Sequence, residues 1–345
     1  MLRLVLSCLL LLSTGARAQD APSAPPTLPP VEQAATVRAA ADLIERRYVD
    51  PAQGHAIAAA LRRGLGRWNA PLAADDFARR ATAHFREVSR DGHLGLSYSA
   101  APLPERDGDA AFDRAEMERW YGAALNHGIE RIERLPGNVM LLDLRVFPPT
   151  EMAGDVFAAA MNVVAQGDAL ILDLRRNGGG GGDAVQLLAG YLLEPDSPLS
   201  GVYDRPTDTL TPAITPPWVP GRRFGADKPL YVLTSKRTFS AAEAAAYDLQ
   251  ALGRALVVGE TTGGGAHPFE YRRIAPHFAV DLPESRSFNP ITGGNWQGRG
   301  VQPDVRVPAD DALEEALRLF EAGRKASGRP VTRNAAATPG PDTAP

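Results

Sequence analysis

Apolar residues recur at spacings of three and four in three successive segments near the start of the chain. These segments are 31–48, 54–68 and 75–88. Such spacing predicts one amphipathic helix in each segment. Three helices this close together indicate a small N-terminal helical bundle, which we place at residues 31–90. Directly afterwards, apolar and small or polar residues alternate over 94–98, as in a half-buried strand.

A second rhythm follows, in which nearly continuous apolar runs alternate with helical patterns. Buried strands are predicted at 138–147, 168–176, 229–235 and 255–260. Helices are predicted in the second half of 101–122 and at 152–165, 183–193, 240–253 and 310–326. Buried strands that alternate with helices indicate an α/β fold with a largely parallel sheet. We assign this core to residues 91–326 and read the stretch between residues 194 and 228 as irregular and rich in proline.

The two ends of the chain differ in composition from this core. Residue Arg3, the apolar run 4–12 and the small-x-small sequence at 16–18 match a secretory signal peptide. The apolar run is too short to span a membrane, so we predict cleavage after Ala18 and export to a periplasm or the medium. At the other end, the Pro/Ala/Thr-rich tail 327–345 is predicted to be disordered.

The single cysteine, Cys8, lies inside the predicted signal peptide. A lipid anchor at Cys8 is an alternative, although the apolar run mostly follows the cysteine. If the signal peptide is removed, the mature chain has no thiol and no disulfide. Residues 19–30 are rich in proline and predict an extended tether outside the core.

Charge and apolar content exclude two classes of partner. The formal net charge is −4 over 345 residues, and basic residues are not concentrated anywhere. Nucleic acid is therefore not an expected partner. No later apolar run approaches the length of a transmembrane helix. Nothing in the sequence predicts an oligomeric state.

Five consecutive glycines, Gly178 to Gly182, stand between a predicted strand and a predicted helix. Glycine allows backbone N–H groups to approach and surround an anion or an oxyanion. The run lacks the Gly-Lys-Ser/Thr ending of a phosphate loop, and no acidic strand end follows as in a dinucleotide site. It is therefore either an oxyanion site or a flexible surface turn.

Ser240 stands where the apolar run 229–235 gives way to a helix. The unpaired N–H groups and the dipole of a helix N-terminus stabilise a developing oxyanion, so a nucleophilic serine gains from this place. Ser240 and Glu243 also form the Ser-x-x-Glu pattern of a capping box, with Thr238 as an alternative cap. On this motif alone, both interpretations are open.

A nucleophilic serine needs a base, and the chain has six histidines. His93 lies in a glycine-flanked turn before a predicted strand, and His267 follows the glycines 263–265. The other histidines lie in the bundle or have no motif around them: His55, His84, His127 and His277. No His-Glu-x-x-His and no clustered Asp/His spacing is present, so neither a metal site nor a cofactor is predicted.

Five segments, taken together and in order, resemble the tail-specific, C-terminal-processing and tricorn-type serine peptidases. Within that family, they resemble bacterial homologues of interphotoreceptor retinoid-binding protein. The segments are RDGHLGL, NHGIERIERLPGNVMLLDLRVF, LILDLRRNGGGGGDAVQLLAGYLL, TSKRTFSAAEAAAYDLQALGRALVVGETTGGGAHP and FNPITGGNWQGRGVQPDV. The resemblance extends to about Val307 and leaves no room for the PDZ domain of the processing branch. It implies a crotonase-like (ClpP/crotonase) ββα core.

The resemblance also implies site residues. It makes Ser240 the nucleophile, and it makes the backbone amides of Gly178, Gly179, Gly180 and Ala241 the oxyanion hole. The histidine of the tricorn-type branch corresponds to His93.

Three positions depart from the family pattern. The lysine of the processing branch is replaced by Gly265, so the Ser/Lys dyad is absent. The serine beside the histidine is replaced by Gly92. The relay glutamate is replaced by Gln297, whose amide can orient an imidazole but cannot supply a charge.

From these residues we predict an exported serine endopeptidase that acts on peptides or unfolded proteins. Ser240 would be the nucleophile, His93 the base with His267 as the alternative, and Gln297 the orienting residue. Because of Gly92 and Gln297, the alternative is a catalytically weak or inactive relative that binds peptides or hydrophobic small molecules in the cleft.

Overall fold

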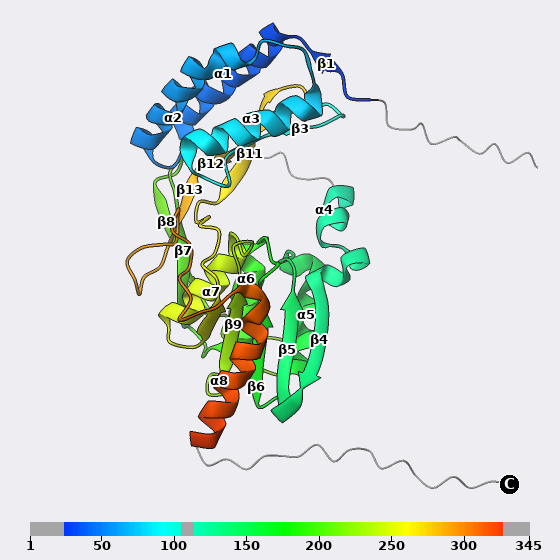
Figure 1. Cartoon of the computed structure of the whole chain (residues 1–345), viewed down its shortest axis with the longest axis vertical. Coiled ribbons are helices and arrows are strands. Elements are labelled where there is room, and N and C mark those ends of the chain that lie inside the picture. Colours follow the sequence, from blue (N-terminus) through cyan, green and yellow to red (C-terminus); the bar gives the residue numbers. More distant parts are fainter. Residues whose placement is uncertain (1–23, 105–113, 327–345) are drawn as a thin grey trace, which may run out of the picture.

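The computed structural model describes residues 24–104 and 114–326 (Figure 1). The predicted signal peptide at 1–18 and the predicted disordered tail at 327–345 lie outside the described residues. In the part of the chain that is described, no helix combines the length and the apolar character needed to cross a bilayer.

The three predicted N-terminal helices are confirmed. They are α1 (Pro30–Arg47), α2 (Pro51–Arg63) and α3 (Ala74–Ser89), with a short 3-10 turn, η1 (Gly64–Arg67), after α2. Proline opens both α1 and α2, where its missing N–H costs nothing. Their apolar stripes meet in one buried cluster that contains Ile44, Phe77 and Phe85.

The end of the predicted tether belongs to this N-terminal unit. Strand β1 (Thr27–Leu28) pairs with β2 (Leu72–Ala73), and the carbonyl of Leu28 accepts a hydrogen bond from Gln33. The side chain of Leu28 packs against the helical cluster, since it is the apolar residue in this proline-rich segment that can be buried there. The prediction that this segment lies outside the core was therefore wrong for its last residues.

A three-stranded antiparallel sheet extends the helical unit beyond residue 90. Its strands are β3 (Gly95–Tyr98), β12 (Phe278–Pro283) and β11 (Phe269–Ala275), in the order β11-β12-β3. One face of β3 and β12 is buried in the same cluster as the helices. A late part of the chain therefore returns to the N-terminal helices, as Figure 1 shows, and this return was not predicted from the sequence.

The core is a six-stranded mixed sheet with the order β14-β10-β9-β6-β5-β4. The strands are β4 (Ile129–Leu135), β5 (Val139–Leu144), β6 (Ala169–Asp173), β9 (Leu230–Thr234), β10 (Leu256–Gly259) and β14 (Val305–Arg306). All neighbours are parallel except β4, which pairs antiparallel with β5 at the edge. The predicted α/β class with a largely parallel sheet is confirmed.

Helices cover both faces of this sheet. Helices α5 (Thr150–Val164), α6 (Gly182–Leu192) and α7 (Ala241–Ala251) share one cluster with it, and α8 (Ala312–Ala326) covers the opposite face. Neighbouring residues such as Leu141 and Leu142 are buried in opposite clusters. Burial on both faces explains why these strands are continuous apolar runs in the sequence.

The stretch predicted as irregular contains a hairpin. Strands β7 (Pro198–Asp204) and β8 (Thr209–Ile214) pair with each other, and β7 also pairs with β13 (Ser285–Phe288). Most of β8 is exposed on both faces, so it has no apolar alternation to reveal it. The remaining elements are α4 (Arg114–Tyr121) and the 3-10 turns η2 (Ala123–Gly128), η3 (Pro136–Asn138) and η4 (Ala309–Asp311).

Candidate active site

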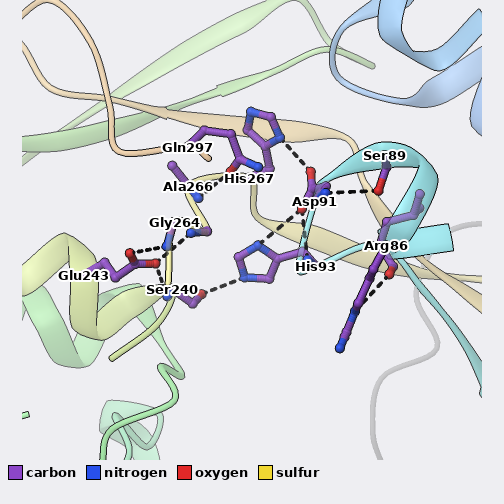
Figure 2. Close-up of polar contacts among 12 residues, drawn as sticks. Arg86, Ser89, Asp91, His93, Ser240, Glu243, Gly264, Ala266, His267 and Gln297 are labelled. Carbon is purple, nitrogen blue, oxygen red and sulfur yellow. Dashed lines mark hydrogen bonds and ion pairs between the residues drawn. The ribbon is translucent and has the colours of Figure 1, made fainter. Parts of the chain in front are cut away.

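Ser240 lies at the junction between β9 and α7, with a backbone conformation that is rare for a residue with a side chain. Its φ is 54° and its ψ is −121°. Such conformations cost about 1–3 kcal/mol and persist where the surroundings hold them. The Ser240 N–H donates to the Glu243 carboxylate at 2.9 Å, which is one half of the predicted capping box. The Ser240 hydroxyl oxygen lies 3.0 Å from Nε2 of His93 (Figure 2).

The Glu243 carboxylate connects the start of α7 to the loop after β10. This side chain is completely buried. Besides the Ser240 N–H, it accepts the Thr262 hydroxyl and the N–H groups of Gly264 and Gly265, both at 2.7 Å. Burial raises the pKa of Glu243, and these hydrogen bonds act in the opposite direction. The cap and the candidate nucleophile are thus compatible, because Glu243 holds the backbone that presents the hydroxyl.

We expect Glu243→Gln to lower the free energy of unfolding by about 2–4 kcal/mol, because an amide cannot accept all four hydrogen bonds and its NH₂ faces buried donors. Chemical denaturation measures the change. Glu260→Gln is the matched control, since Glu260 is partly exposed and pairs weakly with Lys236 at 3.9 Å, so a change below about 0.5 kcal/mol is expected. Equal losses in the two variants would contradict this role of Glu243.

His93 is enclosed in an apolar environment directly after α3. Its imidazole packs against the rings of Phe239 and Phe269, with centroid distances of 4.6 and 5.6 Å, and the residue is 6% exposed. Burial lowers the pKa of His93 to about 4, although the nearby charge of Asp91 raises it. The imidazole is therefore neutral at pH 7, which is the form that a general base requires.

Asp91 is the carboxylate nearest to this imidazole. Its Oδ1 accepts the backbone N–H of His93 at 2.9 Å and lies 4.0 Å from His93 Nδ1. Its Oδ2 accepts from Tyr48 and from Nδ1 of His267, both at 2.8 Å. Sequence reasoning missed Asp91 and Tyr48. Asp91 could have been found from the sequence, because it is the acidic residue two positions before His93 in RDGHLGL.

His267 is directed at Asp91, and the ring nitrogen beside the Ser240 hydroxyl belongs to His93. Gln297 was predicted to orient the imidazole of the base, but it has no hydrogen bond to His93. Its Oε1 accepts the Ala266 N–H at 2.7 Å, and among the described residues Nδ1 of His93 has no hydrogen-bond partner. The reason is that the chain around Gln297 packs on the loop after β10, where Gly298 N–H donates to the carbonyl of Gly264.

The glycine run packs directly against Ser240. Gly179 and Gly180 have φ values of 112° and 132°, which disfavour any residue with a side chain. A Cβ on Gly179 would lie 2.7 Å from the Cβ of Ser240. In the described part of the chain, the N–H groups of Gly178, Gly180 and Ala241 have no acceptor, whereas that of Gly179 donates to Asn177. Backbone donors without an intramolecular acceptor therefore lie beside the hydroxyl.

The ring of Phe239 explains two departures from the family pattern. A Cβ on Gly92 would lie 2.8 Å from this ring, and a Cβ on Gly265 would lie 2.3 Å from it. A serine at position 92 or a lysine at position 265 would therefore require the ring to move. In both places the glycine makes room for a ring that contacts His93.

Within residues 24–104 and 114–326, no group of three or more His, Cys, Asp or Glu side chains is arranged to hold a metal ion. The site consists of a hydroxyl, an imidazole, buried carboxylates and backbone amides.

A family model now identifies the chain. The model of peptidase family S41 matches residues 138–307. The chain belongs to peptidase family S41. The matched region of this S41 chain includes Ser240, the glycine run and Gln297, whereas His93 and Asp91 lie before it. Membership indicates a peptidase, a hydrolase of serine type, and therefore a peptide or protein as substrate.

Solved structures share the fold of this S41 chain at low sequence identity. The "putative peptidase" from Parabacteroides merdae ATCC 43184 is 17% identical over 87% of this chain and 99% of that chain, with a TM-score of 0.60. The photosystem II D1 C-terminal processing protease is 17% identical over 83% and 96%, with a TM-score of 0.50. The tricorn protease is 16% identical, with a TM-score of 0.53, over 86% of this chain but only 37% of its own.

Proposed function

We propose that this chain is an exported serine endopeptidase in which Ser240 attacks the substrate carbonyl carbon and His93 accepts the hydroxyl proton. The observation that carries the proposal is the 3.0 Å distance between the Ser240 hydroxyl oxygen and His93 Nε2. This pair is not neighbouring in the sequence, and the imidazole is neutral at pH 7. A serine hydroxyl beside a neutral imidazole is the arrangement that nucleophilic catalysis requires.

The chemistry follows from the groups around this pair. As the Ser240 oxygen bonds to the carbonyl carbon, its proton moves to His93 Nε2 and the carbonyl oxygen becomes negative. The N–H groups of Gly178, Gly180 and Ala241 supply donors for that oxyanion, next to the N-terminus of α7, whereas the Gly179 N–H is held by Asn177. His93 then protonates the leaving amine, and water hydrolyses the acyl-enzyme by the reverse sequence of proton transfers.

We further propose that the core is crotonase-like without an inserted PDZ domain, and that the chain is exported after cleavage behind Ala18. The ordered family segments support the first statement, and the amino-terminal pattern at residues 1–18 supports the second. The binding-only alternative is not proposed. The two reasons for it were Gly92 and Gln297. The ring of Phe239 explains Gly92, and the carboxylate of Asp91 lies beside His93 although residue 297 is a glutamine.

Labelling with a fluorophosphonate probe tests the proposal on the purified mature protein. We expect the probe to attach to the peptide that contains Ser240, and mass spectrometry of a digest locates it. Ser240→Ala is the matched control and should remain unlabelled. The protein should also cleave a reduced, unfolded protein substrate. Absence of both Ser240-dependent labelling and cleavage would overturn the proposed function.

A further inference from the structure

We propose that Asp91, anchored by Tyr48 and His267, is the residue that positions His93 and compensates its charge, in place of the family's glutamate at position 297. This inference rests on the proposed function. Its starting observation is that Nδ1 of His93 is buried, has no hydrogen-bond partner among the described residues, and lies 4.0 Å from Asp91 Oδ1. The dashed lines in Figure 2 connect this carboxylate to His267 and to His93.

The tautomer of His93 places its proton on the side of Asp91. A base that accepts the Ser240 proton must have Nε2 unprotonated, so the imidazole hydrogen is on Nδ1. When Nε2 takes up the serine proton, the ring becomes a buried cation that packs against the rings of Phe239 and Phe269. A buried cation is costly without a counter-charge, and Asp91 is the carboxylate in place to supply it.

Asp91 is held as an anion by donors on both oxygens. The residue is 1% exposed, and burial opposes its ionisation, but the hydrogen bond from His267 and the backbone N–H of His93 outweigh burial, so the pKa of Asp91 is lowered. Tyr48 remains a donor, because burial and the charge of Asp91 raise the pKa of its hydroxyl.

The anchoring groups come from separate parts of the chain. Tyr48 directly follows α1, His267 lies in the loop after β10, and both donate to Oδ2. They orient the carboxylate so that Oδ1 faces His93. A distance of 4.0 Å is too long for a hydrogen bond, but it is short enough for a charge to act, and catalytic hydrogen bonds often shorten only when substrate binds.

Three charged or ionisable groups on the packed elements around His93 shift its pKa, and a fourth ionisable group, Tyr48, carries no charge. Asp91 raises its pKa, while His267 and Arg86 of α3 lower it, and Tyr48 stays neutral. Removal of the Asp91 charge therefore has two consequences. The imidazolium formed during attack loses its counter-charge, so the reaction slows. The pKa of His93 also falls further, so the acid limb of the activity profile moves to lower pH.

The experiment measures the second-order rate of fluorophosphonate labelling and the kcat and KM for a peptide substrate from about pH 2.5 to pH 9, because the pKa of His93 is about 4. For Asp91→Asn, we expect a loss of about 10²- to 10⁴-fold in labelling rate and kcat, with KM little changed. We also expect a lower midpoint of the acid limb than in the unaltered protein. If Asp91 only stabilised the fold, the folded Asp91→Asn protein would have the same acid-limb midpoint as the unaltered protein.

Three further variants keep the test decisive if Asp91→Asn does not fold. His267→Ala should slow labelling, and His267→Gln, whose amide can still donate to Asp91, should restore part of the rate. Gln297→Glu should raise the rate by less than about threefold, because residue 297 contacts Ala266 and has no hydrogen bond to His93 Nδ1. A tenfold rise in Gln297→Glu, or no slowing in His267→Ala, would overturn the proposal.

Failure of this inference and failure of the proposed function give different results. If the unaltered protein is not labelled at Ser240 and does not cleave an unfolded protein substrate, the proposed function fails. If it is labelled and folded Asp91→Asn has the same rate and the same acid limb, only the role of Asp91 fails.

Discussion

Ser240→Ala and His93→Ala are each expected to lower kcat/KM for peptide hydrolysis by roughly 10⁴- to 10⁶-fold, and the double variant should be no slower than either single one. A nucleophile and its base act as a unit, so the loss of one leaves little for the other to contribute. The 3.0 Å contact between the hydroxyl oxygen and Nε2 is the structural reason to treat these two side chains as such a unit. Steady-state kinetics with a peptide substrate measures the loss.

His277→Ala is the control for the histidine variant. The imidazole of His277 contacts the carbonyl of Ser99 at 2.9 Å, on the edge of the β11-β12-β3 sheet, and no part of the proposed mechanism uses it. Its activity should remain within about twofold of the unaltered protein. If His93→Ala retained fast labelling of Ser240, the base would be another group, with His267 as the first candidate.

Gly180→Ala is expected to reduce kcat/KM by about 10²- to 10³-fold and to lower the free energy of unfolding by about 2–4 kcal/mol. The φ of Gly180 is 132°, and a Cβ there would lie 2.0 Å from the carbonyl oxygen of Phe147. The alanine must therefore displace the loop that is bridged to Phe147, and the backbone donors beside Ser240 move with it. Kinetics and thermal unfolding of the same preparation measure both effects.

Gly182→Ala is the matched control in the same glycine run, at a residue that is not among the proposed oxyanion donors. A Cβ at Gly182 meets nothing within 4 Å, and its φ is outside the left-handed region. Its backbone N–H is retained, so we expect activity within about threefold of the unaltered protein. If Gly180→Ala were equally active, the loop would not supply the oxyanion donors.

Much of the fold could be predicted because its signals are local. Spacing of apolar residues predicted α1, α2 and α3, and continuous apolar runs predicted β5, β6, β9 and β10. The hairpin of β7 and β8 and the return of β11 and β12 could not be predicted in this way. Most of strand β8 is exposed on both faces, and β12 owes its place to pairing with β3, about 180 residues earlier in the chain.

The candidate site also has a part that local sequence predicted and a part that depended on tertiary contacts. Local sequence was sufficient to predict a helix that begins at Ser240 and a glycine turn at Gly178 to Gly182, because caps and backbone freedom depend on near neighbours. The packing of Gly179 against Ser240 is a tertiary contact, since the two residues are far apart in the sequence. The surroundings of His93 depended on tertiary contacts. Asp91 is two residues from His93, whereas Tyr48 and His267 are far from both in the sequence. These residues meet where the helical unit packs on the core. Burial and hydrogen bonding across that contact set the charge of Asp91 and the position of Gln297, and no local pattern encodes either one.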